Sequence, residues 1–473
     1  MSTDLERATG LDLLALARSE DRTGSVRSAW SAVAAASAHA RETGDAVLLA
    51  DAALVMTAAP VGDWELTAQR HSLCEEALLR ADELDDDRAG RLRALLETTR
   101  SPWQRSTTPG AARPGAHAES LSAVLHARHR AAIGAARPEV LLAVADELGA
   151  LAAATGRRED AAWASLWRLD SHCRAGARLE LDAEMMTMAS IVADLASPAW
   201  HWRLAAARTT VALLDGYEAD VPSRADEALR LGETAGVDDA RFVDLIVRST
   251  LAVQTGSGLE EAEREVRQAI AGGPFFAQGW RALILLALGR VDDALSIWLA
   301  LAPRLPELPR DSLEWLVATT GFATLCTAAD DTASARYLME VLTPYADQHV
   351  TAGILTPYEG PVALSLGALA VTLGDRAAAR EHFATALRLS EQMHAPHFAA
   401  RARNALEALS GRVGPLTARE DDIAHLVAGG MTNRQIATRL YLSERTVENH
   451  VSHILRKLDT SSRAGIAARV ARN

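Results

Sequence analysis

One short stretch near the C-terminus combines charged, amide and hydroxyl side chains at helical spacing. Residues 444–458 read ERTVENHVSHILRKL. Apolar residues recur there every three or four positions, which predicts a helix with one face packed on a small core. That face comprises Val447, Val451, Ile454, Leu455 and Leu458. The opposite face carries Arg445, Asn449, Ser452 and Arg456, with Glu448 and His453 at its edges. These side chains offer hydrogen-bond donors and acceptors that suit base edges and phosphates.

The residues around this stretch predict three more short helices that would hold it in place. Capping-box spacings, glycines that end helices and serines that start them occur at fitting positions. These residues are Thr417 with Glu420, Thr432 with Gln435, Gly429, Gly430, Ser443, Ser461 and Ser462. A turn at residues 441–443 would join two helices into a helix-turn-helix, whose second helix enters the major groove. If this helix stood alone, its polar face would be interpreted as an ordinary solvent-exposed surface. Because the caps, the turn and the preceding helix all fit a helix-turn-helix, we interpret the face as one that contacts DNA.

Residues 416–473 resemble the LuxR-type (FixJ/NarL-like) DNA-binding domain. The matching motifs are LTxRE at 416–420, Thr432-Asn433-x-x-Ile436-Ala437, and Ser443-x-Arg445-Thr446-Val447-x-x-His450-Val451 continuing to Lys457-Leu458. The resemblance implies four helices, of which the third reads the major groove. It implies base readers at Glu448, Asn449 and Ser452, and phosphate contacts at Thr446 and Lys457. The DNA-contacting residues expected from the helix face and the resemblance together are Arg445, Thr446, Glu448, Asn449, Ser452, His453, Arg456, Lys457 and Asn433.

Two features depart from the pattern of that family. Some relatives carry a basic residue at the positions of Glu448 and Ser452, whereas Glu448 could accept from a cytosine amine or weaken non-specific binding. Gly465 stands where relatives often have glutamate, and glycine lowers helix propensity by about 1 kcal/mol. The fourth helix, residues 462–472, commonly forms a dimer contact in the family. The resemblance therefore implies a homodimer on double-stranded DNA.

Charge is divided unevenly along the chain. From Leu416 onward there are nine Lys or Arg and six Asp or Glu, whereas the residues upstream hold 40 basic and 56 acidic side chains. An acidic body repels DNA, and a basic tail can approach it. No apolar run suits a membrane span, the first residues lack the apolar core of a secretory signal, and the three cysteines are isolated. A cytoplasmic protein with no membrane partner is expected.

The chain upstream of the tail is rich in Ala, Leu and Arg, with only 4% aromatic residues overall, which favours helices. An imperfect repeat recurs there with the spacing of tetratricopeptide helix pairs, in which small residues let two helices cross closely. The residues that mark the two clearest units are Gly367, Gly374, Ala379, Phe383 and Ala386 within residues 360–393, and Gly289, Ala294, Trp298 and Pro306 in the other.

The predicted fold is all-α: a tetratricopeptide-like helical-repeat solenoid followed by a C-terminal four-helix LuxR-type helix-turn-helix domain. Its expected parts are N-terminal helical repeats at 1–100, a loop rich in Pro and Gly at 101–117, the solenoid at 118–409, a linker at 410–415 and the DNA-binding domain at 416–473.

Residues 74–96 and 373–396 resemble the helical-repeat region of large ATP-binding LuxR-family regulators. In those relatives an ATPase module precedes the solenoid, and its phosphate-binding loop needs a lysine. Lys457 is the only lysine in the chain, so no ATPase module is expected. No catalytic constellation and no metal-ligand spacing is visible. We therefore expect no enzyme activity, no cofactor and no metal.

The concave surface of a solenoid commonly binds something, so a small-molecule or protein effector is expected on the body. Trp200 and Trp202, beside His201, could line a ligand groove, although the simpler interpretation places all ten tryptophans in repeat cores. We prefer the simpler one. Two functions stay open. The first is a transcriptional regulator whose body senses an effector and controls the tail. The alternative is a protein-interaction scaffold with a weak or vestigial DNA-binding tail.

Overall fold

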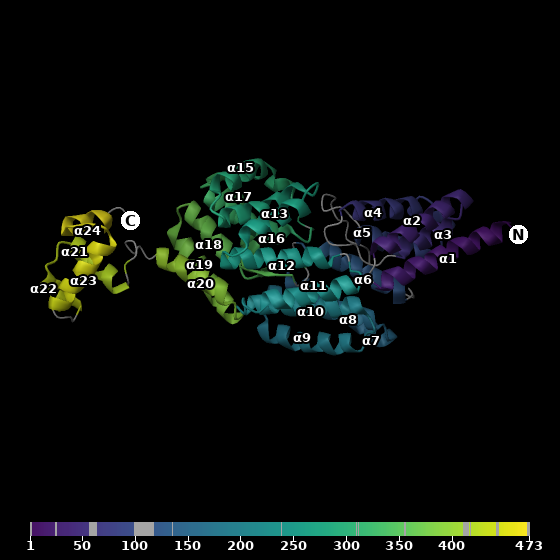
Figure 1. Ribbon diagram of the computed structural model, residues 1–473, viewed down its shortest axis with the longest axis horizontal. Coiled ribbons are helices and arrows are strands. Elements are labelled where there is room, and N and C mark those ends of the chain that lie inside the picture. Colours follow the sequence, from purple (N-terminus) through teal and green to yellow (C-terminus); the bar gives the residue numbers. More distant parts are fainter. Residues whose placement is uncertain are drawn as a thin grey trace.

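The computed structural model describes residues 2–23, 26–55, 64–98, 118–134, 136–237, 239–308, 310, 312–353, 356–409, 416, 418–440 and 444–470. The expected loop at 101–117, the linker at 410–415, Thr417 and the turn at 441–443 lie outside these ranges and stay predictions. Within the described ranges the chain forms twenty-four α-helices and one two-stranded sheet, which confirms the all-α class. Figure 1 shows the N-terminal helices at one end, a large helical body in the middle and the last four helices at the other end.

The first five helices form a group with its own core. They are α1 (Ser2–Thr23), α2 (Val26–Thr43), α3 (Ala46–Leu54), α4 (Trp64–Leu78) and α5 (Asp86–Thr98), with the 3₁₀ turn η1 (Ala81–Glu83) before α5. Leu14, Val33 and Leu92 are buried among them. The Asp45 carboxylate accepts from the backbone N–H of Leu48 and so caps α3. Because α5 packs on α6 (Ala118–Ala132), this group adjoins the body.

Fifteen helices, α6 to α20, build the body, and each packs against the next. After α6 they are α7 (Pro138–Thr155), α8 (Arg158–Ala175), α9 (Arg178–Ala193), α10 (Pro198–Leu214), α11 (Val221–Thr234), α12 (Ala240–Thr255), α13 (Leu259–Ala269), α14 (Gln278–Ala287), α15 (Val291–Leu301), α16 (Trp315–Ala328), α17 (Thr332–Leu342), α18 (Val362–Thr372), α19 (Arg376–Gln392) and α20 (Pro396–Leu409), with 3₁₀ turns η2 (Phe275–Ala277), η3 (Ala302–Glu307) and η4 (Thr343–Tyr345). In the described ranges, no helix combines the length and apolarity that crossing a bilayer requires.

The clearest predicted repeat unit is the helix pair α18–α19. Gly374 lies between the two helices with φ +77°, a conformation that glycine adopts without steric cost. A Cβ atom on Gly367 would lie 2.5 Å from the Phe383 ring, so the glycine lets the aromatic side chain fill the space between the helices. Ala379 and Ala386 are fully buried. The pair therefore packs as its spacing predicts, and the assignment to the tetratricopeptide class stays a prediction.

The second predicted unit is the pair α14–α15. Gly289 turns the chain between these helices with φ +75°. Ala294 and Trp298 are buried, and the Trp298 indole N–H donates to the Asp331 carboxylate at 3.3 Å. The expected Pro306 falls within η3, just after α15. Here too, small and aromatic residues occupy the positions that the repeat spacing predicts.

A β-hairpin that the sequence did not predict joins α17 to α18. Strands β1 (His349–Thr351) and β2 (Tyr358–Pro361) pair antiparallel, with Val350 opposite Gly360. The hairpin lies across the inner side of the stack: Thr351 Oγ1 donates to Asp170 of α8 at 3.0 Å, and the Thr250 hydroxyl of α12 donates to Glu359 at 2.9 Å. It therefore bridges helices that are far apart in the sequence.

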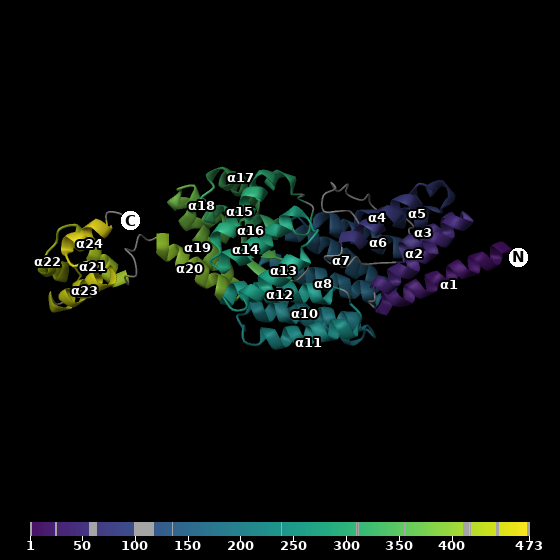
Figure 2. The same ribbon diagram turned by 45° about the horizontal axis from the view of Figure 1, so that its top comes forward.

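The first helices of the body also contact the last ones directly. Arg178, at the start of α9, donates to the backbone oxygen of Met393 at 3.2 Å and forms an ion pair with Asp215. Arg137 pairs with Asp347 at 2.7 Å, and one buried cluster joins residues of α8 to α10 with Tyr358 and with Phe398 of α20. The stack thus curves so that its last helix reaches α8 to α10, and Figures 1 and 2 both show α20 lying close to α12.

Candidate nucleic-acid interface

The last four helices form a compact group with a separate core. They are α21 (Ala418–Ala428), α22 (Asn433–Leu440), α23 (Glu444–Lys457) and α24 (Arg463–Val470), coloured yellow in Figure 1. All four predicted helices are therefore present. The residues that build the core are Leu416, Ile423, Ala424, Val427, Ile436, Ala437, Val447, Val451, Ile454, Leu458 and Ile466. Each helix contributes to this core, so the position of α23 is fixed by packing from the other three.

Local caps set the ends of these helices, as the sequence predicts. The backbone N–H of Thr432 donates to the Gln435 side chain at 2.8 Å, and the N–H of Gln435 donates to Thr432 Oγ1 at 3.3 Å. This reciprocal pair is a capping box at the start of α22. Gly430 follows α21 with φ +80°. Ser462 Oγ accepts from the N–H of Gly465 at 3.1 Å, which caps α24.

Helix α23 divides into the two predicted faces. Val447, Val451, Ile454 and Leu458 are buried, and Leu455 is half-buried against the same core. The side chains on the other face point to solvent: Arg445, Glu448, Asn449, Ser452, His453 and Arg456 are all exposed. A row of exposed polar groups on a helix anchored by its back is the arrangement that major-groove reading requires.

Three of the expected DNA contacts are less exposed, and two of them take part in the internal structure of the domain. Thr446 is half-buried. Asn433 is half-buried and accepts from the guanidinium of Arg463 at 2.7 Å, which ties α22 to α24. The third, Lys457, donates to the Glu420 carboxylate at 2.6 Å. The roles of these residues toward DNA stay predictions, and the structure gives two of them a second, structural role.

The ion pair between Lys457 and Glu420 is a feature that sequence reasoning missed. The Glu420 side chain is 5% exposed and the Lys457 side chain 33% exposed. The pair joins the end of α23 to the first turn of α21, and in the low dielectric of that position the attraction is less screened than at the surface. Only the capping role of Glu420 could be anticipated, because its distance of 37 positions from Lys457 has no local sequence signal.

Close packing against Thr460 explains why glycine is suited to position 465 in α24. A Cβ atom at this position would lie 1.8 Å from the Thr460 hydroxyl, so a larger residue requires the Thr460 side chain to move. Gly465 thus accommodates Thr460, which lies just before α24.

Residues 414–470 match the family described as bacterial regulatory proteins, luxR family. The C-terminal segment is a LuxR-type helix-turn-helix domain. Among similar proteins, a putative HTH-type transcriptional regulator of Mycobacterium tuberculosis is 42% identical over 59 residues. The nitrate/nitrite response regulator protein NarL of Escherichia coli is 47% identical over 55 residues, and the transcriptional regulatory protein DegU of Brevibacillus brevis is 48% identical over 48.

These similarities cover only the LuxR-type domain. They span 12%, 12% and 10% of this chain, and 7%, 26% and 20% of the three relatives. The chain thus matches no more than about a quarter of the length of these relatives, and the body lies outside the matched segment. Any function of the body has to be argued from its own residues.

The described tryptophans of the body all lie in or against hydrophobic clusters, and some of them also line a cavity. Five are buried members of these clusters, as the simpler interpretation expects: Trp167, Trp200, Trp202, Trp298 and Trp315. Trp163, Trp167, Trp202 and Trp280 line a cavity inside the stack, whereas His201 is exposed elsewhere and hydrogen-bonds its own helix. Within the described ranges, no group of three His, Cys, Asp or Glu side chains is placed to hold a metal ion.

Proposed function

We propose that this chain is a DNA-binding transcriptional regulator whose helical body senses a small-molecule or protein effector and controls a tail that reads the major groove. The observation that carries the proposal is the exposed polar row of α23, held on a core built by four helices. The match to the luxR family and the names of the three relatives as regulators support it. A regulator that binds bacterial chromosomal DNA would act in the cytoplasm.

The side chains of α23 suit specific base edges. The Asn449 amide can donate to and accept from an adenine, and the Glu448 carboxylate can accept from a cytosine amine. Ser452 donates to the backbone oxygen of Glu448 at 2.9 Å, which leaves its hydroxyl oxygen free to accept from a base or water. Arg445 and Arg456 add positive charge near the two ends of the helix and suit phosphates.

A homodimer would place two tails on two half-sites about one helical turn of DNA apart. In this proposal α24 supplies the contact between tails, and the body sets their spacing or covers α23. An effector shifts such an equilibrium only if it binds the two states of the protein unequally.

Selection from a random-sequence duplex library with the full chain tests the proposal. One enriched site is expected, with an affinity that falls steeply as salt rises, because phosphate contacts release counterions. Arg456→Ala should weaken all sequences about equally and lower the salt slope by about one. Arg403→Ala, an exposed arginine on the body, is the control. Retention of no duplex at low salt would contradict the proposal.

The second candidate function is a protein-interaction scaffold. The observations that favour it are the 56 acidic against 40 basic residues upstream of the tail and the mild basic excess within it. A scaffold would bind a protein partner stably and show almost no salt-dependent DNA binding. The same salt titration, run beside a pull-down of the full chain, therefore separates the two functions.

A further inference from the structure

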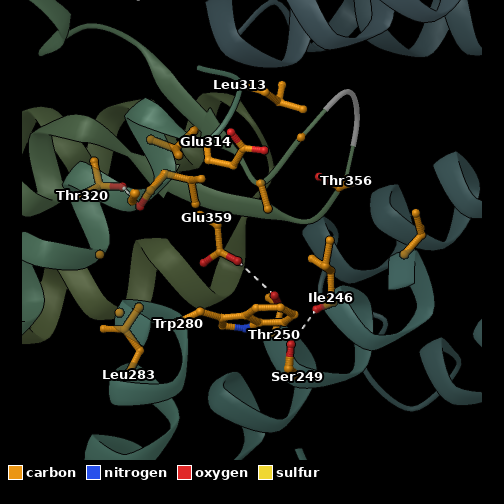
Figure 3. A pocket seen from close by; sticks show the side chains of 18 of the residues that line it. Ile246, Ser249, Thr250, Trp280, Leu283, Leu313, Glu314, Thr320, Thr356 and Glu359 are labelled. Carbon is orange, nitrogen blue, oxygen red and sulfur yellow. Dashed lines mark hydrogen bonds between the residues drawn. The ribbon is translucent and has the colours of Figure 1, made fainter. Parts of the chain in front are cut away.

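A cavity of about 750 Å³ lies on the inner side of the body, and we call it the inner cavity. Its walls come from α6, α8, α10, α12, α14 and α16, and the β-hairpin, α18 and α20 complete it. Figure 3 shows part of it, with Glu359 of β2 on one side and Thr250, Ser249 and Trp280 on the other. A volume of this order accommodates a small organic molecule.

Apolar and aromatic side chains make up most of the lining. Phe242 and Trp280 form an edge-to-face pair with ring centroids 6.0 Å apart, and Ile246 and Leu283 lie beside them. Rings of this kind supply large apolar contact area in binding sites. A flat apolar body is therefore the form of ligand that this part of the cavity favours.

Among the described residues, one cationic side chain of the lining forms no ion pair, although it feels the charge of Glu359. Arg401 of α20 makes no hydrogen bond or ion pair with the described residues, and its guanidinium carbon lies 5.7 Å from the centroid of the Phe398 ring. Its surface is open to the cavity although protein surrounds it, and this burial lowers its pKa, while Glu359 acts in the opposite direction. The group stays charged, because arginine pKa values lie far above neutrality.

The groups around Arg401 leave its charge only partly compensated. Burial raises the pKa of Glu359 to about 7, against the opposing effects of the Thr250 hydrogen bond and of Arg401. Its carboxyl is therefore neutral in a large part of the molecules at neutral pH. His397, one turn before Arg401, is uncharged because burial lowers its pKa to about 4.

The lining holds other charged residues besides Arg401 and Glu359. Arg203 lies over the rings of Trp163, Trp200 and Trp202, at 5.1 to 5.4 Å from their centroids, and it has a further partner. The remaining charged lining residues are Arg130, Asp239 and Glu314. Because Glu314 is a carboxylate, a ligand ammonium is the rival chemistry that an experiment must test.

We propose that the inner cavity binds a small organic acid, whose flat apolar body lies against Phe242 and Trp280 and whose carboxylate is held by Arg401. The planar guanidinium matches a carboxylate with two parallel hydrogen bonds. This inference rests on the proposed function in taking the body as the effector-sensing part. Arg401 lies on α20, which ends at Leu409, shortly before the first core residue of the tail, Leu416. Occupancy of the cavity therefore acts on the helix that leads to the DNA-binding domain.

Three probes of one shape test the charge that the cavity selects. Isothermal titration calorimetry of the full chain at pH 7 compares 2-naphthoate, 2-naphthamide and 2-naphthylmethylammonium. We expect 2-naphthoate to bind at least about tenfold more tightly than the amide, because a charge-assisted pair is roughly twice as strong as a neutral hydrogen bond. The ammonium probe should bind most weakly.

Variants on one helix assign the effect to Arg401. Arg401→Gln should reduce the affinity for 2-naphthoate to that for the amide, and Arg401→Lys should give an intermediate value. Arg403→Gln, on the same helix but outside the cavity lining and paired with Glu391 at 3.3 Å, should leave the affinity unchanged. Thermal unfolding of each variant verifies that it is folded.

Three outcomes would overturn the inference: tighter binding of the ammonium probe, an unchanged affinity of folded Arg401→Gln for 2-naphthoate, or no binding of any probe at millimolar concentration. No DNA is present in these titrations. Failure of DNA binding would therefore refute the proposed function without affecting the proposed carboxylate site. Failure of probe binding would refute the carboxylate site without affecting the proposed DNA binding.

Discussion

Replacing Glu359 with glutamine removes a titrating group from the wall of the inner cavity and should change how stability depends on pH. Burial raises the folded-state pKa of Glu359 from its ordinary value near 4.5 to about 7. Between these values the folded state binds more protons than the unfolded state, so the stability contributed by this group falls as pH rises and is fully lost above pH 7. The ionised form costs about 3.5 kcal/mol at most, because the pKa rises by about 2.5 and each pKa unit corresponds to about 1.4 kcal/mol, and water in the cavity lowers this cost.

Thermal unfolding of the wild type and Glu359→Gln between pH 5 and 8.5 measures this effect. The glutamine keeps a hydrogen-bonding partner for Thr250 but cannot ionise. We expect the stability advantage of the variant to grow from pH 5 to pH 8 and then level off, with a final Tm difference of roughly 5 °C. Glu260→Gln, an exposed carboxylate on α13, controls for the loss of one acidic group. Parallel pH profiles for the wild type and Glu359→Gln would refute the reasoning.

Lys457→Ala should lower the free energy of unfolding of the LuxR-type domain by about 1–3 kcal/mol, because it takes the cation from the buried Glu420 carboxylate; urea unfolding measures the loss, and an unchanged midpoint would contradict it. Gly367→Ala should destabilise the body by about 1–3 kcal/mol, because its Cβ would lie 2.5 Å from the Phe383 ring. Gly90→Ala in α5 has open space at the Cβ position and should stabilise by up to about 1 kcal/mol, so opposite Tm shifts are expected for the two alanines.

Local signals were enough to predict the tail. The 3.6-residue periodicity of α23, the capping box of Thr432 and Gln435, and the turn at Gly430 all involve residues within one or two helical turns of each other. Each such signal acts on its own neighbourhood, so a single sequence reveals it. The ion pair of Lys457 with Glu420 escaped prediction because it joins two helices through the tertiary structure.

The inner cavity could not be located from the sequence, because helices far apart in the chain, from α6 to α20, line it together. Trp200 and Trp202 illustrate the difficulty. They lie two positions apart on α10 and therefore point to different faces of the helix. Both are buried in hydrophobic clusters, but only Trp202 also lines the cavity. The β-hairpin was missed because each of its strands is at most four residues long, which is too short for a periodicity signal.

Disulfide trapping between α23 and a base in the major groove tests the central claim most directly. Cys74, Cys173 and Cys326 are buried, so Asn449→Cys introduces an accessible thiol of its own. Two versions of the enriched duplex are compared. One carries a thiol tether on a cytosine N4 in the major groove, and the other carries it on a guanine N2 in the minor groove. Our account predicts trapping at one major-groove position within the site and almost none from the minor groove. Equal trapping from both grooves, or a yield no higher than that of Leu299→Cys, a 73% exposed position on α15, would contradict it.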